Sequence, residues 1–258
     1  MKIVALVAFL LTAATASCLG DEVSCPAPAW DYGSGSSGPA HWGDLDYDWK
    51  ACSAGTMQSP IVTGTLTGDQ RMSAIVLGDR TSKLTVRKTS HELKVYTGVA
   101  DSNKVWVIAY EEQVLRLLQF HFHVPAEHRD GGTPIGEIHF VFRMTSGRLL
   151  VLAVWIDEGQ ENGALQKIID AKPTASCATG TTASELSIAQ LLPSNRNHYA
   201  RYEGSLTTPP CDENVTWIIE LEPIHATKAQ VEKLRVGTSA NARPTQPLNG
   251  RTVRWRQQ

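Results

Sequence analysis

Three histidines have the residue types and the spacing of a catalytic zinc site. His121 and His123 alternate with Phe120 and Phe122, and because successive side chains of a β-strand point to opposite faces, the two imidazoles face the same way. A loop rich in Gly and Asp follows, and His139 lies in the next apolar stretch, which predicts a neighbouring strand. Three nitrogen ligands that leave a fourth position for water are typical of catalytic zinc, whereas structural zinc usually takes four protein ligands.

The alternative for these histidines is a hydrogen-bonded group in the core. Taken singly, a histidine is more often structural or exposed than functional. Two same-facing histidines on an apolar strand change that balance, because each buried ring carries two polar nitrogens that need partners. The spacing therefore favours metal binding.

Two polar residues support this interpretation. Gln119 stands two residues before His121, and Glu137 stands two residues before His139, so each shares a strand face with a proposed ligand. A carbonyl or carboxylate there can hold an imidazole N–H and fix its tautomer. The other interpretation is that both are ordinary polar strand residues, but a buried acid without a partner is uncommon.

Composition and charge narrow the class of partner. The chain has 258 residues, with 24 Lys and Arg against 26 Asp and Glu, and a net charge of −2. This balance gives no electrostatic reason to expect nucleic acid or an anionic membrane as a partner. We therefore expect a small-molecule substrate.

The first residues predict export. Lys2 is followed by an apolar run over residues 3–14 and by small residues up to Ala16, the pattern of a secretory signal peptide over residues 1–20 with cleavage near 16–20. A membrane anchor is the alternative, but the run is shorter than the roughly 20 residues that a spanning helix needs. No other segment could span a bilayer, so residues 21–258 are expected in an extracellular, cell-wall or periplasmic location.

The five cysteines fit an exported protein. Cys18 falls in the signal region or at the edge of the mature chain, with a lipoprotein cysteine as the alternative. The other four, Cys25, Cys52, Cys177 and Cys211, allow three pairings into two disulfides, among which the sequence alone does not choose. Asn214 begins an N-x-Thr glycosylation site, although it lies in an expected strand.

The elements that must position these residues are mostly strands. Segments rich in β-branched and aromatic residues alternate with turn residues, and they span residues 74–77, 84–88, 92–96, 105–109, 114–124, 135–144, 149–156 and 215–221. Apolar residues at helical spacing predict helices over 162–171, 184–192 and 227–236, with Ser184 and Thr227 as N-caps. Residues 30–49 are expected to form an ordered loop or flap. The pattern predicts one β-dominated α+β domain with short peripheral helices.

Longer motifs resemble those of a known family. The segment Gln119-Phe120-His121-Phe122-His123, then Glu127-His128, then Glu137-Ile138-His139 is similar to the zinc-site sequence of alpha-class carbonic anhydrases. Further motifs of the family follow in the family's order, from about Trp30 to Trp255. They are Gln58-Ser59-Pro60-Ile61, Gly204-Ser205-Leu206-Thr207-Thr208-Pro209-Pro210, Val215-Thr216-Trp217 and Asn241-Ala242-Arg243-Pro244-Thr245-Gln246-Pro247-Leu248.

The resemblance implies a single domain around a large twisted, mostly antiparallel sheet, with Zn²⁺ at the floor of a conical cleft. The implied reaction is the reversible hydration of carbon dioxide to bicarbonate and a proton through zinc-bound hydroxide. By the family pattern His121, His123 and His139 are the zinc ligands, and Gln119 and Glu137 orient them.

The same matching assigns further roles around the metal. Thr207 would accept a hydrogen bond from the zinc-bound hydroxide and pass its own proton to Glu127, which aims the nucleophilic lone pair at the substrate. Taken alone, Thr207 would be a turn residue before two prolines. Thr208 would border the bicarbonate site, and His128 is expected to be a buried structural histidine.

The substrate carbon dioxide and the released proton need different parts of the site. An apolar pocket suits a small apolar substrate, although ordinary core packing is the alternative for its residues. His91 matches the family's proton-shuttle position, against the alternative of a lone surface histidine, and Tyr32 matches a tyrosine that orders the connecting water. The pocket residues by the family pattern are Val141, Val154, Leu206 and Trp217.

Some positions depart from the family pattern. Val124 stands where fast members often have Trp, and Lys94 lies near His91, where a cation would disfavour the protonated imidazole. Cys52 and Cys211 match the disulfide of secreted members, which leaves Cys25 with Cys177 by elimination.

Two other function classes are weaker. A carbonic-anhydrase-like binding module with weak or lost catalysis is the main alternative, but inactive relatives lack one or more of the three histidines and this chain keeps all of them. A zinc peptidase is disfavoured because the sequence has no His-Glu-x-x-His segment.

Overall fold

The computed structural model describes residues 29–64, 66–69, 71–132 and 134–256. The expected signal peptide, Cys18 and Cys25 lie outside these residues. In the described part, no helix combines the length and the apolar character needed to cross a membrane.

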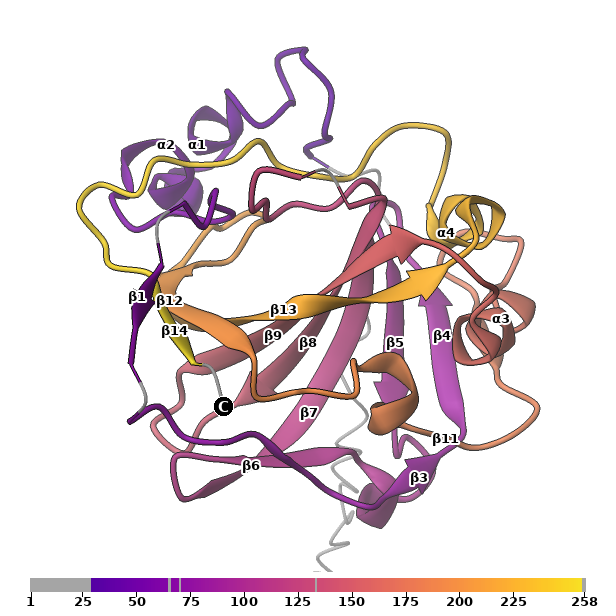
Figure 1. Ribbon diagram of the computed structural model, residues 1–258. Coiled ribbons are helices and arrows are strands. Elements are labelled where there is room, and N and C mark those ends of the chain that lie inside the picture. The colour runs from indigo at the N-terminus through magenta and orange to yellow at the C-terminus, as the bar shows by residue number, and fades with distance from the viewer. Residues whose placement is uncertain (1–28, 65, 70, 133, 257–258) are drawn as a thin grey trace, which may run out of the picture.

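A sheet of twelve strands forms the body of the molecule (Figure 1). Its strands are β1 (Thr67–Gly68), β2 (Val76–Leu77), β4 (Leu84–Lys88), β5 (Leu93–Thr97), β6 (Val107–Tyr110), β7 (Gln113–His123), β8 (Gly136–Arg143), β9 (Leu149–Glu158), β10 (Thr179–Thr181), β12 (Tyr199–Ser205), β13 (Glu213–Ala226) and β14 (Arg254–Arg256). Their order is β1-β14-β12-β13-β9-β8-β7-β5-β4-β10, with β6 pairing both β2 and β7. Of the strand pairs within the described residues, only β1 with β14 and β13 with β9 are parallel. The prediction of a single β-dominated, mostly antiparallel domain is confirmed.

The central strands β7, β8 and β9 separate two kinds of side chain. Phe120, Phe122 and Phe140 are at most 1% exposed and pack into the main hydrophobic core on one face. His121 and His123 alternate with them and therefore point to the opposite face. The pairing of β7 with β8 sets His121 directly across from His139, so strand register alone brings the histidines of two segments together.

Short helices lie at the edges of the sheet (Figure 1). They are α1 (Trp42–Leu45), α2 (Ala51–Ala54), α3 (Gly163–Asp170) and α4 (Lys228–Leu234), with 3-10 turns η1 (Tyr47–Trp49), η2 (Ser102–Lys104) and η3 (Ile188–Leu191). Two of the predicted helices are present as α3 and α4. Asn162 caps α3, and Thr227 forms a capping box at the start of α4.

The predicted helix over residues 184–192 is wrong. Leu186–Ser187 forms strand β11, which pairs antiparallel with β3 (Thr81–Ser82). The 3-10 turn η3 follows, and its capping box starts at Ser187 rather than at Ser184. Pairing with a distant segment therefore overrides the local helical spacing. The other strands and α-helices that were not predicted are strands β1, β3, β10, β12 and β14 and the two short helices α1 and α2.

One disulfide joins distant parts of the chain. The S–S bond links Cys52 in α2 to Cys211 across 159 residues of sequence. Both cysteines pack with the buried Trp42. Because Cys25 lies outside the described residues, its pairing with Cys177 stays a prediction.

A buried acid on β13 has no hydrogen-bond partner. Glu220 is fully buried between Val154 of β9 and Tyr199 of β12, and neither carboxyl oxygen makes a hydrogen bond with the residues described. Burial raises the pKa of Glu220 well above its usual range. Burying an ionised carboxylate without a partner lowers the stability of the folded protein.

We expect Glu220→Leu to stabilise the protein. A carboxyl group whose pKa is raised by folding holds more protons in the folded than in the unfolded state, so stability falls as the pH rises above the unfolded value of about 4.3. Glu220→Leu should therefore raise the free energy of unfolding by about 1–3 kcal/mol at pH 7, with a gain that shrinks toward pH 4. Urea unfolding at the two pH values measures this change in the free energy of unfolding.

The control is the exposed Glu158→Leu, which should change the free energy of unfolding by less than about 0.5 kcal/mol. A gain for Glu220→Leu that does not depend on pH would contradict the explanation.

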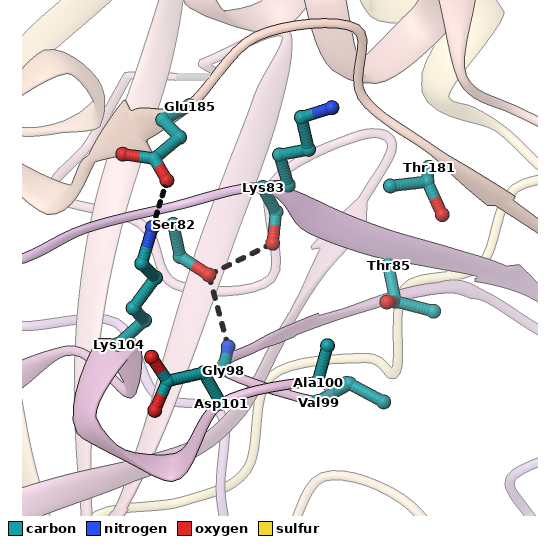
Figure 2. A pocket seen from close by; sticks show the side chains of 10 residues that line it. All are labelled: Ser82, Lys83, Thr85, Gly98, Val99, Ala100, Asp101, Lys104, Thr181 and Glu185. Atoms are coloured by element: carbon teal, nitrogen blue, oxygen red, sulfur yellow. Dashed lines mark hydrogen bonds and ion pairs between the residues drawn. The ribbon is translucent and has the colours of Figure 1, made fainter.

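A hollow of about 550 Å³ lies beside the hairpin of β4 and β5 (Figure 2). Lys104 forms an ion pair with Glu185 in its wall. None of the expected site residues lines this hollow.

Candidate metal centre

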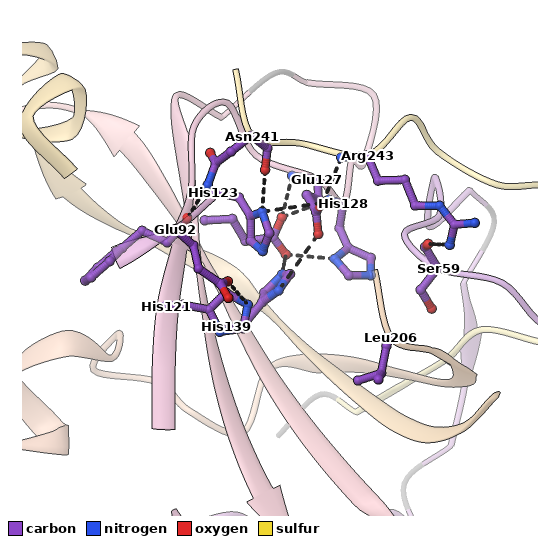
Figure 3. A network of polar contacts seen from close by, with 12 residues as sticks. Ser59, Glu92, His121, His123, Glu127, His128, His139, Leu206, Asn241 and Arg243 are labelled. Atoms are coloured by element: carbon purple, nitrogen blue, oxygen red, sulfur yellow. Dashed lines mark hydrogen bonds and ion pairs between the residues drawn. The ribbon is translucent and has the colours of Figure 1, made fainter. Parts of the chain in front are cut away.

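Three buried imidazoles converge on the face of the sheet opposite the main core. His121, His123 and His139 are 9%, 0% and 1% exposed. One ring nitrogen from each lies within 4.8 Å of the others, and the rings lie side by side at one end of β7 and β8 (Figure 3). Adjacent strands thus bring together the three histidines that the sequence singled out.

Hydrogen bonds fix which nitrogen of His121 and of His123 is free. His121 Nδ1 donates to Gln119 Oε1 at 2.9 Å, and His123 Nδ1 donates to the carbonyl oxygen of Asn241 at 2.6 Å. The proton on Nδ1 leaves a lone pair on Nε2 in both rings. His123 Nε2 is buried and has no hydrogen-bond partner in the described part of the chain, as a metal ligand requires.

His139 presents its other nitrogen. Its Nε2 lies 3.0 Å from Glu137 Oε1, in a contact that is not aligned as a hydrogen bond. The carboxylate favours a proton on Nε2, which leaves the lone pair on Nδ1. The free nitrogens of the three rings are therefore two Nε2 atoms and one Nδ1.

Glu137 also binds a second histidine. Its Oε1 accepts from His128 Nδ1 at 2.7 Å, and its Oε2 accepts from the backbone N–H groups of Glu127 and His128. Burial alone would raise the pKa of Glu137, but His128 and His139 lower it well below its usual range. The Nε2 of His128 contacts the hydroxyl of Tyr202 at 2.7 Å. Because both of its nitrogens have partners, His128 offers no lone pair to a metal.

The histidines have the charge state that a metal needs. Burial lowers the pKa of His121 well below its usual range and also lowers that of His139, so both rings are neutral near pH 7. Neutral imidazole is the form that binds a metal. Three converging ring nitrogens, from His121, His123 and His139, fit the ligand set of catalytic zinc.

A cavity of about 280 Å³ opens beside His121 and His139. Thr207, Thr208 and Gln119 contribute polar groups to its wall. Its apolar part consists of Val141, Leu149, Val151, Leu206, Pro209 and Trp217.

The assignment of Val154 to this cavity is wrong. Val154 is fully buried in the main core on the other face of β9. Val151, three residues earlier, lines the cavity instead. Side chains alternate along a strand, so an odd offset of three places the two valines on opposite faces.

Glu127 lies behind the histidines with one oxygen free. Its Oε1 accepts from the backbone N–H of Arg243 at 2.8 Å, and its Oε2 is buried without a hydrogen-bond partner among the described residues. Thr207 is 5% exposed and lines the cavity. The contacts of the described residues do not include the expected hydrogen bond from Thr207 to Glu127, which stays a prediction.

His91 lies outside this cavity. Its ring stacks on Trp30 with centroids 3.6 Å apart and planes within 3°, and its Nε2 donates to the carbonyl oxygen of Trp30 at 2.8 Å. His91 and Tyr32 line a separate hollow of about 410 Å³, and the buried Tyr32 hydroxyl makes no hydrogen bond with the residues described. The structure thus does not bring these two residues to the histidine cavity.

Two charged side chains line the cavity, Glu92, which was not predicted, and Lys94, which was expected only near His91. Glu92 Oε1 accepts from Lys94 Nζ at 2.9 Å, while Glu92 Oε2 lies 3.5 Å from His121 Nε2. Burial alone would raise the pKa of Glu92, but His121 and Lys94 lower it to about 2. The expected effect of Lys94 on His91 is therefore offset, because the ammonium charge is paired with Glu92. The sequence contained a signal for this pair, because Glu92 immediately precedes β5 and lies two residues from Lys94, a spacing that places both on one face of an extended chain.

Comparisons with known proteins agree with this geometry. Residues 37–257 match the family model described as eukaryotic-type carbonic anhydrase. A carbonic anhydrase of Nostoc sp. is 35% identical over 247 residues, covering 92% of this chain and 89% of that one, and one of Neisseria gonorrhoeae is 36% identical over 233 residues, covering 87% and 86%. The solved alpha-carbonic anhydrase of Thermovibrio ammonificans, in complex with sulfanilamide, superposes with a TM-score of 0.78 at 35% identity, covering 87% of this chain and 98% of that one.

Proposed function

Because the chain belongs to the family of eukaryotic-type, or alpha, carbonic anhydrases, we propose that it is a zinc enzyme that hydrates carbon dioxide to bicarbonate and a proton, and catalyses the reverse reaction. The observation that carries this proposal is the set of three buried histidines whose free nitrogens converge beside a largely apolar cavity. In the reaction a water oxygen bonds to carbon and one water proton leaves.

His121, His123 and His139 would hold the zinc. When bound, zinc supplies a water activated for attack near neutral pH, and carbonic anhydrases are themselves the reference case, in which the pKa of that water is about 7. Gln119, Glu137 and the Asn241 carbonyl hold the three rings in the tautomers described above.

Thr207 and Glu127 would orient the attacking oxygen. A threonine hydroxyl has one proton, so giving it to Glu127 leaves only lone pairs to accept a hydrogen bond from that oxygen. The buried Oε2 of Glu127 supports this role, because it is an acceptor that makes no hydrogen bond with the described residues. Thr208 would border the bicarbonate product.

The apolar wall would hold carbon dioxide. Val141, Leu206 and Trp217, with Val151 in place of Val154, present hydrocarbon surface beside the histidines. A small apolar substrate leaves water for such a wall without needing hydrogen bonds.

A stopped-flow assay of carbon dioxide hydration tests the proposal. Protein with one equivalent of zinc should accelerate hydration, a chelator should abolish the activity, and added zinc should restore it. Protein with stoichiometric zinc and no hydration activity would contradict the proposal.

His91 would carry the proton to solvent. Its ring would first leave the stack on Trp30 and turn toward the cavity, and Tyr32 would order the water between His91 and the cavity.

We expect His91→Ala to lower the hydration rate in weak buffer by about ten- to hundredfold and expect imidazole buffer to restore that rate. Stopped-flow rates in weak and strong buffer measure this, with the exposed His41→Ala as a control that keeps the wild-type rate. If His91→Ala ran at the wild-type rate in weak buffer, the shuttle role would be dropped.

The enzyme would act outside the cytoplasm. Residues 1–20 would be its signal peptide and residues 21–258 its catalytic domain. The disulfide between Cys52 and Cys211 supports an oxidising compartment. Asn214 is exposed at the start of β13 and would accept a glycan in a eukaryotic secretory pathway.

A further inference from the structure

One ion pair lines the cavity beside the histidines. Apart from His121 and His139, Glu92 is the only acidic and Lys94 the only basic side chain among the described residues of the cavity wall. Their charged atoms lie 2.9 Å apart, and their side chains are 11% and 29% exposed. A salt bridge in this position keeps both groups ionised.

The carboxylate of Glu92 is fixed in place. Thr89 brackets its backbone, because Thr89 Oγ1 accepts from the Glu92 N–H at 3.0 Å and donates to the Glu92 carbonyl at 2.8 Å. Lys94 holds Oε1 of the side chain. Glu92 therefore has few ways to turn its charge away from the cavity.

The negative end of the pair faces the metal ligands. Glu92 Oε2 lies 3.5 Å from His121 Nε2, the nitrogen that Gln119 leaves free (Figure 3). Glu127 and Glu137, by contrast, lie behind the rings and do not line the cavity. Of the three carboxylates near the histidines, Glu92 is the one that an incoming ligand meets.

We propose that Glu92 is a specificity-determining residue, whose fixed negative charge disfavours small anions in the cavity relative to neutral carbon dioxide. This inference rests on the proposed function. Like charges a few ångströms apart repel strongly where water is scarce, whereas an uncharged substrate is not affected. Bicarbonate carries a charge that carbon dioxide lacks, so the same carboxylate promotes release of the product. Lys94 acts in the opposite sense, but its ammonium is tied to the far oxygen of Glu92.

The test measures azide binding to the zinc-loaded protein by isothermal titration calorimetry. Glu92→Gln keeps the shape and removes the charge, and we expect it to lower the dissociation constant of azide by about tenfold. Lys94→Gln should raise that constant, because it leaves Glu92 without its counter-charge. Glu185→Gln breaks the ion pair with Lys104 in the remote hollow of Figure 2, and as a matched control it should leave the constant unchanged.

A lower dissociation constant of azide in Glu92→Gln and a higher one in Lys94→Gln would show that the charges of the two side chains, and not their packing, affect anion binding. An unchanged or weaker affinity in Glu92→Gln, or shifts of the same sign in both variants, would overturn the inference. Loss of stoichiometric zinc from Glu92→Gln would also overturn it, since it would make Glu92 a metal ligand.

Azide binding needs no turnover, so the two proposals fail separately. If zinc-loaded wild type does not hydrate carbon dioxide but the azide shifts appear, only the proposed function falls. If zinc-loaded wild type hydrates carbon dioxide but Glu92→Gln leaves the dissociation constant of azide unchanged, only the inference about Glu92 is overturned. A chain that binds no zinc would overturn both.

Discussion

His139→Ala is expected to lose bound zinc and to lower kcat/KM for carbon dioxide hydration by more than about 100-fold. Loss of a residue that merely orients a metal ligand typically costs 10- to 100-fold in metal affinity or activity, and His139 supplies one of only three converging nitrogens. Zinc content of the purified protein and stopped-flow hydration rates check this expectation.

The variant needs controls because His139 is buried. His198→Ala replaces a partly exposed histidine that is not among the converging ligands, and it should keep both zinc and rate. Thermal unfolding of the variant beside metal-free wild type separates loss of metal from loss of fold. A folded His139→Ala protein that keeps stoichiometric zinc and wild-type kcat/KM would remove His139 from the ligand set.

Replacing both Cys52 and Cys211 by serine is expected to lower the free energy of unfolding by about 2–5 kcal/mol. A cross-link across 159 residues lies at the upper end of that range if it acts by restricting the unfolded chain. The bridge also lies in the native network, because the Cys211 carbonyl accepts from Gln58 and the Cys52 carbonyl accepts from Arg243. For a chain of this size the loss amounts to roughly 4–20 °C in Tm.

Thermal and denaturant unfolding of the double serine variant measure the effect. Reduction of the wild type under native conditions should produce a comparable loss. The single variant Cys52→Ser, which leaves Cys211 unpaired, should be at least as unstable as the double variant. A double variant within about 0.5 kcal/mol of wild type would show that the bridge is not a source of stability.

Strand alternation made part of the site predictable. The alternation of His121 and His123 with phenylalanines identified the two faces of β7, and the same rule placed Gln119 next to His121. That rule also shows why Val154 was misassigned, because a shift of an odd number of residues exchanges the two faces of a strand. Family motifs identified the strands that line the cavity, but they did not determine which face of a strand each side chain occupies.

Contacts between distant segments were not predictable. The carbonyl of Asn241 holds His123 from 118 residues away in sequence, and a backbone carbonyl has no residue-type signal. Glu92 was hidden for a similar reason, since its importance comes from the neighbouring strand that carries His121. The helix expected over 184–192 failed because Leu186 pairs with a strand about a hundred residues earlier.

The backbone contacts of Asn241 and Arg243 determine when the centre can be completed during synthesis. The Asn241 carbonyl holds the ring of His123, and the Arg243 N–H holds Glu127, yet both residues belong to the C-terminal segment that runs back over the molecule after α4 (Figure 1). A nascent chain that has emerged only as far as β13 already contains all three histidines but not these two partners. The finished geometry therefore forms only when nearly the whole polypeptide is free to fold. With the export and the zinc site proposed above, metal would be acquired after translocation.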